Sequence, residues 1–113
     1  MELYSTNNPD LRAGLSEAIF QALPPDRGLY MPLEITPLSA SFFDKLSSMP
    51  MAEMGFRICR HLFQGSIPDN DLKEIVYGAI NFPAPLVEIN DHIHVLELFH
   101  GTSLEYKDFG ARF

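Results

Sequence analysis

Apolar residues in the first third of the chain occur in short runs separated by turn-forming residues. Residues 2–6 have an extended pattern and are followed by a turn-forming cluster at 7–10, which predicts a strand and then a turn. A helix is expected next, with Ser16 at its cap or in its first turn, because apolar residues recur at helical spacing until Pro24 and Pro25. That face consists of Leu15, Ala18, Ile19, Ala22 and Leu23. A tight turn then leads into a short extended stretch at 29–31.

Helical spacing dominates the middle of the chain. A short helix is expected around 42–46, with Ser39 or Ser41 as a possible cap, and a longer one from about Met51 to Phe63. The longer helix has a wide apolar face, which predicts that it points to the interior. This face consists of Ala52, Met54, Phe56, Ile58, Cys59, Leu62 and Phe63.

The most regular pattern lies between residues 72 and 80. Asp69 and Asp71 come at its start, where carboxylates interact favourably with the helix dipole. The positions that follow the i, i+3, i+4, i+7, i+8 pattern are Leu72, Ile75, Val76, Ala79 and Ile80. A helix with one buried stripe is therefore expected here.

The pattern changes after residue 81. Pro83 and Pro85 prevent the helix from continuing, and two apolar runs around an Asn-Asp turn predict a β-hairpin over 86–99. Residues 100–113 leave the hairpin through Gly101 and begin a helix that carries Phe109 and Phe113. The expected fold class is therefore α+β, with about three main helices and a small sheet that includes a C-terminal hairpin.

Composition narrows the class of protein. The 113 residues are 46% hydrophobic and 20% charged, which is typical of one small globular domain with a modest core. Eight basic against fifteen acidic residues give a net charge of −7, which disfavours binding to nucleic acid or to an anionic membrane. A single cysteine, the lack of a leader pattern, and the lack of any apolar run of roughly 20 residues favour a cytoplasmic protein.

Most residues that could carry chemistry have a structural explanation. His92 and His94 are two apart on a predicted strand and share a face, but no third ligand is near, so no metal site is expected. Cys59 is expected to be a small core residue and His61 to be exposed. The carboxylates around 69–74 are explained by helix capping, and no glycine-rich nucleotide loop or hydrolase motif occurs.

Lys107 is the remaining candidate. It follows a strand, a glycine turn and an aromatic residue, Tyr106, and precedes a predicted helix. Covalent amine catalysis is favoured at such a junction, because partial desolvation activates an amine and a rigid turn fixes its reach. Residue types alone also allow a surface lysine paired with Asp108 or Glu105.

Four segments together resemble the start of the threonine synthase family. Leu3-Tyr-Ser-Thr-Asn7 and Leu23-Pro-Pro-Asp-Arg-Gly-Leu-Tyr-Met-Pro32 come first. Phe82-Pro-Ala-Pro-Leu86 follows, and the last segment is Leu96-Glu-Leu-Phe-His-Gly101 with Tyr106-Lys-Asp-Phe-Gly-Ala-Arg-Phe113. They occur in the family's order and span the whole chain.

The resemblance implies an enzyme of the tryptophan-synthase-β-like fold type that uses pyridoxal 5'-phosphate. Such enzymes convert O-phosphohomoserine and water to threonine and phosphate. By resemblance, Lys107 is the catalytic residue and holds the cofactor covalently, while Tyr106 packs on the cofactor ring. Residues 1–99 then form an N-terminal α+β domain and 100–113 begin the cofactor-binding region. We expect this chain to be a truncated front part that is inactive alone.

The chain departs from the family pattern just before the lysine. Thr102 stands where the family has proline, Ser103 where it has threonine, and Glu105 where it has a small residue. Two alternatives stay open at this point. One is a stand-alone helical module that docks on a partner, and the other is a related lyase such as a serine or threonine dehydratase.

Overall fold

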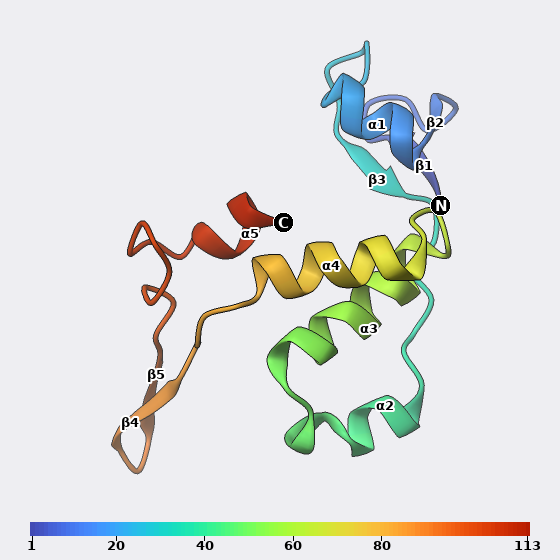
Figure 1. Cartoon of the computed structure of the whole chain (residues 1–113). Coiled ribbons are helices and arrows are strands. Elements are labelled where there is room, and N and C mark those ends of the chain that lie inside the picture. The colour runs from blue at the N-terminus through green and yellow to red at the C-terminus, as the bar shows by residue number, and fades with distance from the viewer.

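A three-stranded antiparallel sheet forms the N-terminal part of the chain in the computed structural model, which describes residues 1–113 (Figure 1). Strand β1 (Glu2–Ser5) lies between β2 (Arg12–Gly14) and β3 (Tyr30–Pro32). Helix α1 (Leu15–Gln21) follows β2 directly and packs on the sheet. Its only buried residue is Ala18, and Leu3 and Ala13 are the buried apolar residues of the sheet. The predicted first strand, turn, helix and extended stretch are all present.

Two details of this unit differ from the sequence prediction. Strand β2 was not expected; its three residues are too few for alternation to be recognised. Gly14 occupies the N-cap of α1, and Ser16 lies in the first turn, which is one of the two positions that the sequence allowed for it. The helix ends at Gln21, since Ala22 has a φ of 61°. Ile19 and Leu23 therefore remain more than half exposed and are not core residues.

The helical part begins with α2 (Ala40–Asp44) and a 3-10 turn at Leu46–Ser48. Helices α3 (Met51–Phe63) and α4 (Asp69–Ala79) then pack against each other, each starting directly after a proline. Ser39 occupies the N-cap position of α2, but its hydroxyl does not bond to the helix backbone. The three longest helices, α1, α3 and α4, are the main helices that the sequence predicts.

Helix α4 contributes the most completely buried apolar residues of the structure. Leu72, Val76 and Ala79 are at most 1% exposed, as the periodic pattern predicts. Gly55 on α3 lets the two helices approach, because a Cβ atom there would lie 2.5 Å from the Ile80 side chain. The wide face predicted for α3 is buried less completely. None of its residues is fully buried, and Ile58 is 39% exposed.

The C-terminal part consists of a hairpin and a short helix. Strands β4 (Leu86–Asn90) and β5 (Ile93–Leu96) pair antiparallel, with a bulge between Glu88 and Asn90. The second strand ends at Leu96, three residues earlier than predicted. Helix α5 (Asp108–Arg112) then returns to α4, where the rings of Phe82 and Phe109 lie 4.2 Å apart (Figure 1). The predicted helical start after Gly101 is confirmed.

The chain does not close around one core. Only 12 of 113 residues are buried, and the accessible surface is 7981 Å², against about 6,300 Å² for a compact monomer of this mass. The radius of gyration is 16.7 Å, against about 13 Å for a compact domain of this length. The expectation of one modest core is therefore wrong, because the small apolar clusters lie in separate parts of the chain. None of the helices is long and apolar enough to cross a membrane.

The burial of α4 leads to a stability prediction. Leu72→Ala removes a side chain that is 1% exposed and should lower the free energy of unfolding by about 2–5 kcal/mol, since it leaves a cavity. Ile75→Ala, on the same helix but 37% exposed, should cost less than half as much. Urea denaturation followed by circular dichroism measures both values. Equal losses would show that α4 does not bury the face described here.

Candidate functional site

The segment between β5 and α5 holds the candidate lysine and is shaped by two tight turns. The Leu104 amide donates to the Gly101 carbonyl at 3.2 Å, and the Asp108 amide donates to the Glu105 carbonyl at 3.1 Å. Leu104 adopts a left-handed conformation with a φ of 58° between these turns. The chain therefore reverses direction twice before α5, and Lys107 lies at the N-cap of that helix.

Asp108 is the anchor of this segment. It is 7% exposed, and its two carboxylate oxygens accept bonds from the Ser103 amide at 2.7 Å and the Ser103 hydroxyl at 2.6 Å. Gly101 is needed here, because a Cβ atom at that position would collide with the Asp108 carboxylate. The Ser103 hydroxyl, and then the Ser103 amide and the nearby cations, hold the pKa of Asp108 below its usual value against the opposing effect of burial.

Lys107 itself is accessible. Its side chain is 61% exposed, and its ammonium pairs with the Glu105 carboxylate at 3.0 Å. The adjacent Tyr106 is 75% exposed. The partial desolvation expected at this junction is therefore not provided by these 113 residues. The surface pairing with Glu105 that the sequence allows is present, while pairing with Asp108 is not, since Asp108 binds Ser103 instead.

The residues that immediately precede this segment in the chain are also held in place by side-chain and backbone contacts. The His100 ring nitrogen Nε2 lies 2.6 Å from a Glu97 carboxylate oxygen, and the ring stacks on Phe99 at 4.8 Å. The Glu97 amide donates to the Pro85 carbonyl at 2.9 Å, which ties the end of β5 to the start of β4. The amine of Lys107 is thus presented on a backbone fixed at both ends.

The other residues singled out from the sequence lie elsewhere. His92 lies in the hairpin turn, not on a strand, so it does not share a strand face with His94. Nowhere does the structure gather three His, Cys, Asp or Glu side chains around a possible metal position. Cys59 is half-buried, and burial raises the pKa of its thiol.

His61 differs from the prediction of simple exposure. It is half-buried, and its Nε2 atom lies 2.8 Å from the Thr36 carbonyl and 2.9 Å from the Thr36 hydroxyl. This contact fastens the linker between β3 and α2 onto α3. Spacing along the sequence could not reveal it, because the two residues are 25 positions apart.

A second polar anchor was missed for the same reason. Ser5 is fully buried, and its hydroxyl lies 2.7 and 2.8 Å from the two Asp26 oxygens. The Gly28 amide donates to the same carboxylate at 3.0 Å. The Ser5 hydroxyl and then the Gly28 amide lower the pKa of Asp26. Both residues belong to segments that resemble the family, but their contact locks the N-terminal turn and does not reach the lysine segment.

Comparisons with known proteins match the whole chain. The family model described as threonine synthase N terminus matches residues 2–80. Threonine synthase of Haemophilus influenzae is 38% identical over 113 residues, which is 100% of this chain and 26% of that protein. Threonine synthase of Escherichia coli is 31% identical over the same lengths. The chain therefore spans about a quarter of the relatives that it matches.

Solved structures agree with this match. The crystal structure of threonine synthase from Escherichia coli superposes with a TM-score of 0.90 at 28% identity, over 99% of this chain and 27% of that one. A PLP-bound threonine synthase from Brucella melitensis superposes with a TM-score of 0.88 at 31% identity, over 99% and 26% of the two chains. Neither of the alternative classes left open by the sequence is favoured by these comparisons.

The Asp108 anchor leads to a prediction that does not require the cofactor. Because hydrogen bonds to a carboxylate are stronger than those to a neutral amide, Asp108→Asn should speed hydrogen exchange at the Ser103 amide. Asp91→Asn, in the exposed hairpin turn, should leave that exchange unchanged.

The same bonds have a defined pH dependence. The pKa of Asp108 is lowered in the fold, so the bonds are fully present above the usual carboxyl value of about 3.9 and are lost as the pH falls through the lowered value. Amide chemical shifts of Ser103 measured by NMR across this range report the loss. A shift that titrates near neutral pH would contradict the assignment.

Proposed function

Because this chain belongs to the threonine synthase family, we propose that it forms the N-terminal part of an enzyme that converts O-phosphohomoserine and water to threonine and phosphate. The proposed enzyme is a cytoplasmic carbon–oxygen lyase that uses pyridoxal 5'-phosphate. Residues 1–99 form the supporting domain, and residues 100–113 begin the cofactor-binding region. The observation that carries the proposal is the lysine segment, in which a buried anchor holds a turn that presents one accessible amine.

The residues of that segment fit pyridoxal phosphate. An aldehyde needs an amine that it can reach, and Lys107 Nζ is accessible and contacts only the Glu105 carboxylate. An aromatic cofactor ring needs a flat apolar surface, and the Tyr106 ring is 75% exposed. Lys107 would therefore hold the cofactor covalently and Tyr106 would pack against it. When bound, pyridoxal phosphate supplies an electron sink for the elimination of phosphate.

The chain's own residues have distinct parts in this chemistry. Lys107 Nζ carries the covalent attachment and, when released, accepts and returns a proton. Glu105, at 3.0 Å, holds the free ammonium close to the turn. Asp108 acts through Ser103 and Gly101, because it fixes the backbone from which the lysine extends. These 113 residues supply one wall of the site, so the chain alone is expected to be inactive.

The large exposed surface supports placement in a longer polypeptide. A self-contained module of this mass would bury more of its surface, whereas Phe20 is 88% and Phe113 48% exposed. Relatives are about four times as long as this chain. The exposed apolar side chains are suited to contacts with the remainder of such a protein.

The assignment of Lys107 is tested in a chimera. Residues 1–113 replace the matching quarter of the Haemophilus influenzae relative, so the rest of the family fold is present. With added pyridoxal phosphate, the chimera should show visible absorption, and borohydride reduction should label Lys107 in a peptide map. It should also release phosphate from O-phosphohomoserine, whereas the 113-residue chain should not.

The matched controls distinguish a loss of covalent cofactor attachment from a general loss of folding. Lys107→Ala should abolish the visible band, the label and phosphate release, because no other residue replaces the amine. Lys73→Ala, on exposed α4 surface, should retain all three. A label on another lysine would overturn the role of Lys107, and absence of any label in a folded chimera would overturn the proposed enzyme.

The role of Tyr106 has its own test. Tyr106→Ala should weaken retention of pyridoxal phosphate roughly tenfold, since an aromatic contact contributes about 0.5–1.5 kcal/mol beyond burial. Tyr106→Phe keeps the ring and should bind within twofold of the unchanged chimera. Dialysis followed by absorbance measures both. Equal retention in all three proteins would show that the ring does not contact the cofactor.

A further inference from the structure

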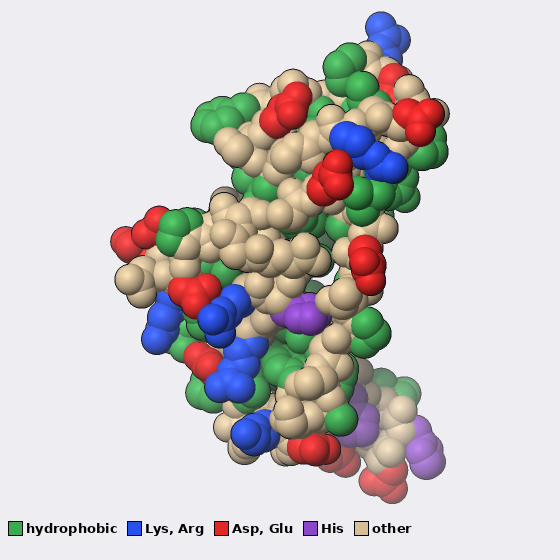
Figure 2. Space-filling model, turned by 90° about the vertical axis from the view of Figure 1, so that its right-hand side faces the viewer, with side chains coloured by type: hydrophobic (Ala, Val, Ile, Leu, Met, Phe, Trp, Pro, Cys, Tyr) green, Lys and Arg blue, Asp and Glu red, His purple; other side chains and the backbone are tan.

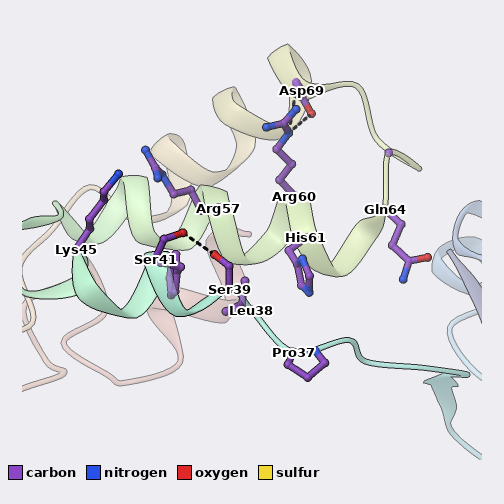
Figure 3. A pocket seen from close by; sticks show the side chains of 12 residues that line it. Pro37, Leu38, Ser39, Ser41, Lys45, Arg57, Arg60, His61, Gln64 and Asp69 are labelled. Carbon is purple, nitrogen blue, oxygen red and sulfur yellow. Dashed lines mark hydrogen bonds and ion pairs between the residues drawn. The ribbon is translucent and has the colours of Figure 1, made fainter.

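A polar hollow of about 710 Å³ lies between α2 and α3, far along the chain from the lysine segment (Figure 3). Helix α2 and the linker before it form one wall, and the C-terminal half of α3 forms the other. The start of α4 contributes Asp69 at one end. His61 fastens the linker to α3 through Thr36, so this wall is held by a specific contact. No residue that lines the hollow is bonded to the lysine segment.

The charge of this hollow is opposite to that of the chain. Lys45, Arg57 and Arg60 line it, which places three of the eight Lys and Arg residues in one region of a chain with net charge −7. Asp69 is the one carboxylate among the lining residues. Figure 2 shows several Lys and Arg side chains close together on one side of a histidine, with Asp and Glu side chains among them. Focused positive charge in a concave region attracts anions.

The cations keep donors that the chain does not use. Arg57 bonds to Glu53 at 2.6 Å and Arg60 to Asp69 at 3.1 Å, in both cases only through Nε. The terminal guanidinium nitrogens of both residues make no hydrogen bond, and the Lys45 ammonium makes neither a hydrogen bond nor an ion pair. An anion can therefore bind without breaking any existing pair.

Two hydroxyl groups complete the donor set. Ser39 and Ser41 bond to each other at 3.0 Å, and because each hydroxyl has one proton, the accepting one keeps its own proton for another partner. In Figure 3 these hydroxyls face each other, while Lys45 and Arg57 extend to the same side above them. The neighbouring Glu53 does not line the hollow, and it accepts hydrogen bonds from Arg57 at 2.6 Å and from Tyr77 at 2.8 Å.

This combination of donors selects one class of ligand. Guanidinium groups bind oxyanions through parallel hydrogen bonds, and a lysine adds a point charge, which together suit a phosphate group with its three exposed oxygens. We propose that the α2–α3 hollow binds the dianionic phosphate group of a small molecule. The source is either free phosphate or a phosphate monoester. This ligand site is separate from the proposed cofactor site and does not depend on it.

Binding is measured in two proteins. The ¹⁵N-labelled chain of 113 residues is titrated with inorganic phosphate, with phosphoserine as a monoester probe, and with sodium chloride at equal ionic strength. In the chimera, the acetylation rates of Lys45 and Lys73 are compared by mass spectrometry with and without phosphate. Phosphate should give saturable shifts around residues 39–45 and 57–61, and it should slow acetylation of Lys45 but not of Lys73, which lies outside the hollow.

Variants test whether the named cations carry the binding. Lys45→Gln with Arg57→Gln should weaken phosphate binding at least tenfold, while Lys73→Gln should leave it within twofold. The Lys45 ammonium makes no hydrogen bond or ion pair, and Arg57 is in an exposed pair with Glu53, so these side-chain changes should not unfold the chain.

The outcomes are decisive in either direction. Tighter binding of phosphoserine than of phosphate would identify a monoester as the ligand, and the reverse order would identify free phosphate. Shifts equal to those with chloride, absence of Lys45 protection in the chimera, or unchanged binding in the double variant would each overturn the proposal. The cofactor-labelling result for Lys107 is independent of all of these.

Discussion

The packing of α4 against α3 is the constraint on which the rest of the helical structure depends. The most completely buried apolar side chains are those of Leu72, Val76 and Ala79 on α4. Gly55 on α3 allows the close approach of the two helices. Helix α5 then lies on the same α4, with Phe82 against Phe109 and Arg112 bonded to the Asn81 side chain at 2.7 Å. The position of the candidate lysine is therefore set by a helix almost thirty residues earlier in the chain.

Side-chain hydrogen bonds, rather than a large apolar core, hold the irregular segments of this chain in place. Asp108 holds Ser103, Asp26 holds Ser5, and His61 holds Thr36, so each irregular segment is fastened by a carboxylate or a ring nitrogen. Such bonds are strong where the acceptor is charged and where a glycine allows close approach. They keep the turns in place even though much of the chain's apolar surface is exposed.

The lysine segment and the hollow between α2 and α3, the two regions proposed to bind ligands, differ in how their cations are paired. At the lysine segment, Glu105 neutralises the amine, and this carboxylate stands where the family pattern has a small residue. In the hollow between α2 and α3, each arginine is only partly neutralised, and Lys45 is not paired at all. An unpaired cation near two partly free guanidinium groups raises the local potential, although the chain as a whole is acidic.

The sequence alone determined the periodic elements, because α3 and α4 carry enough helical turns for their apolar spacing to be recognised. It also determined the family, since Lys107 and Tyr106 lie in a contiguous motif that a linear reading can find. Tertiary structure decided which apolar faces are buried, as the exposed Ile19 and Ile58 show, because burial depends on the neighbour that is present. It also decided the anchors and the basic hollow, whose members are distant in sequence and meet only after the helices pack.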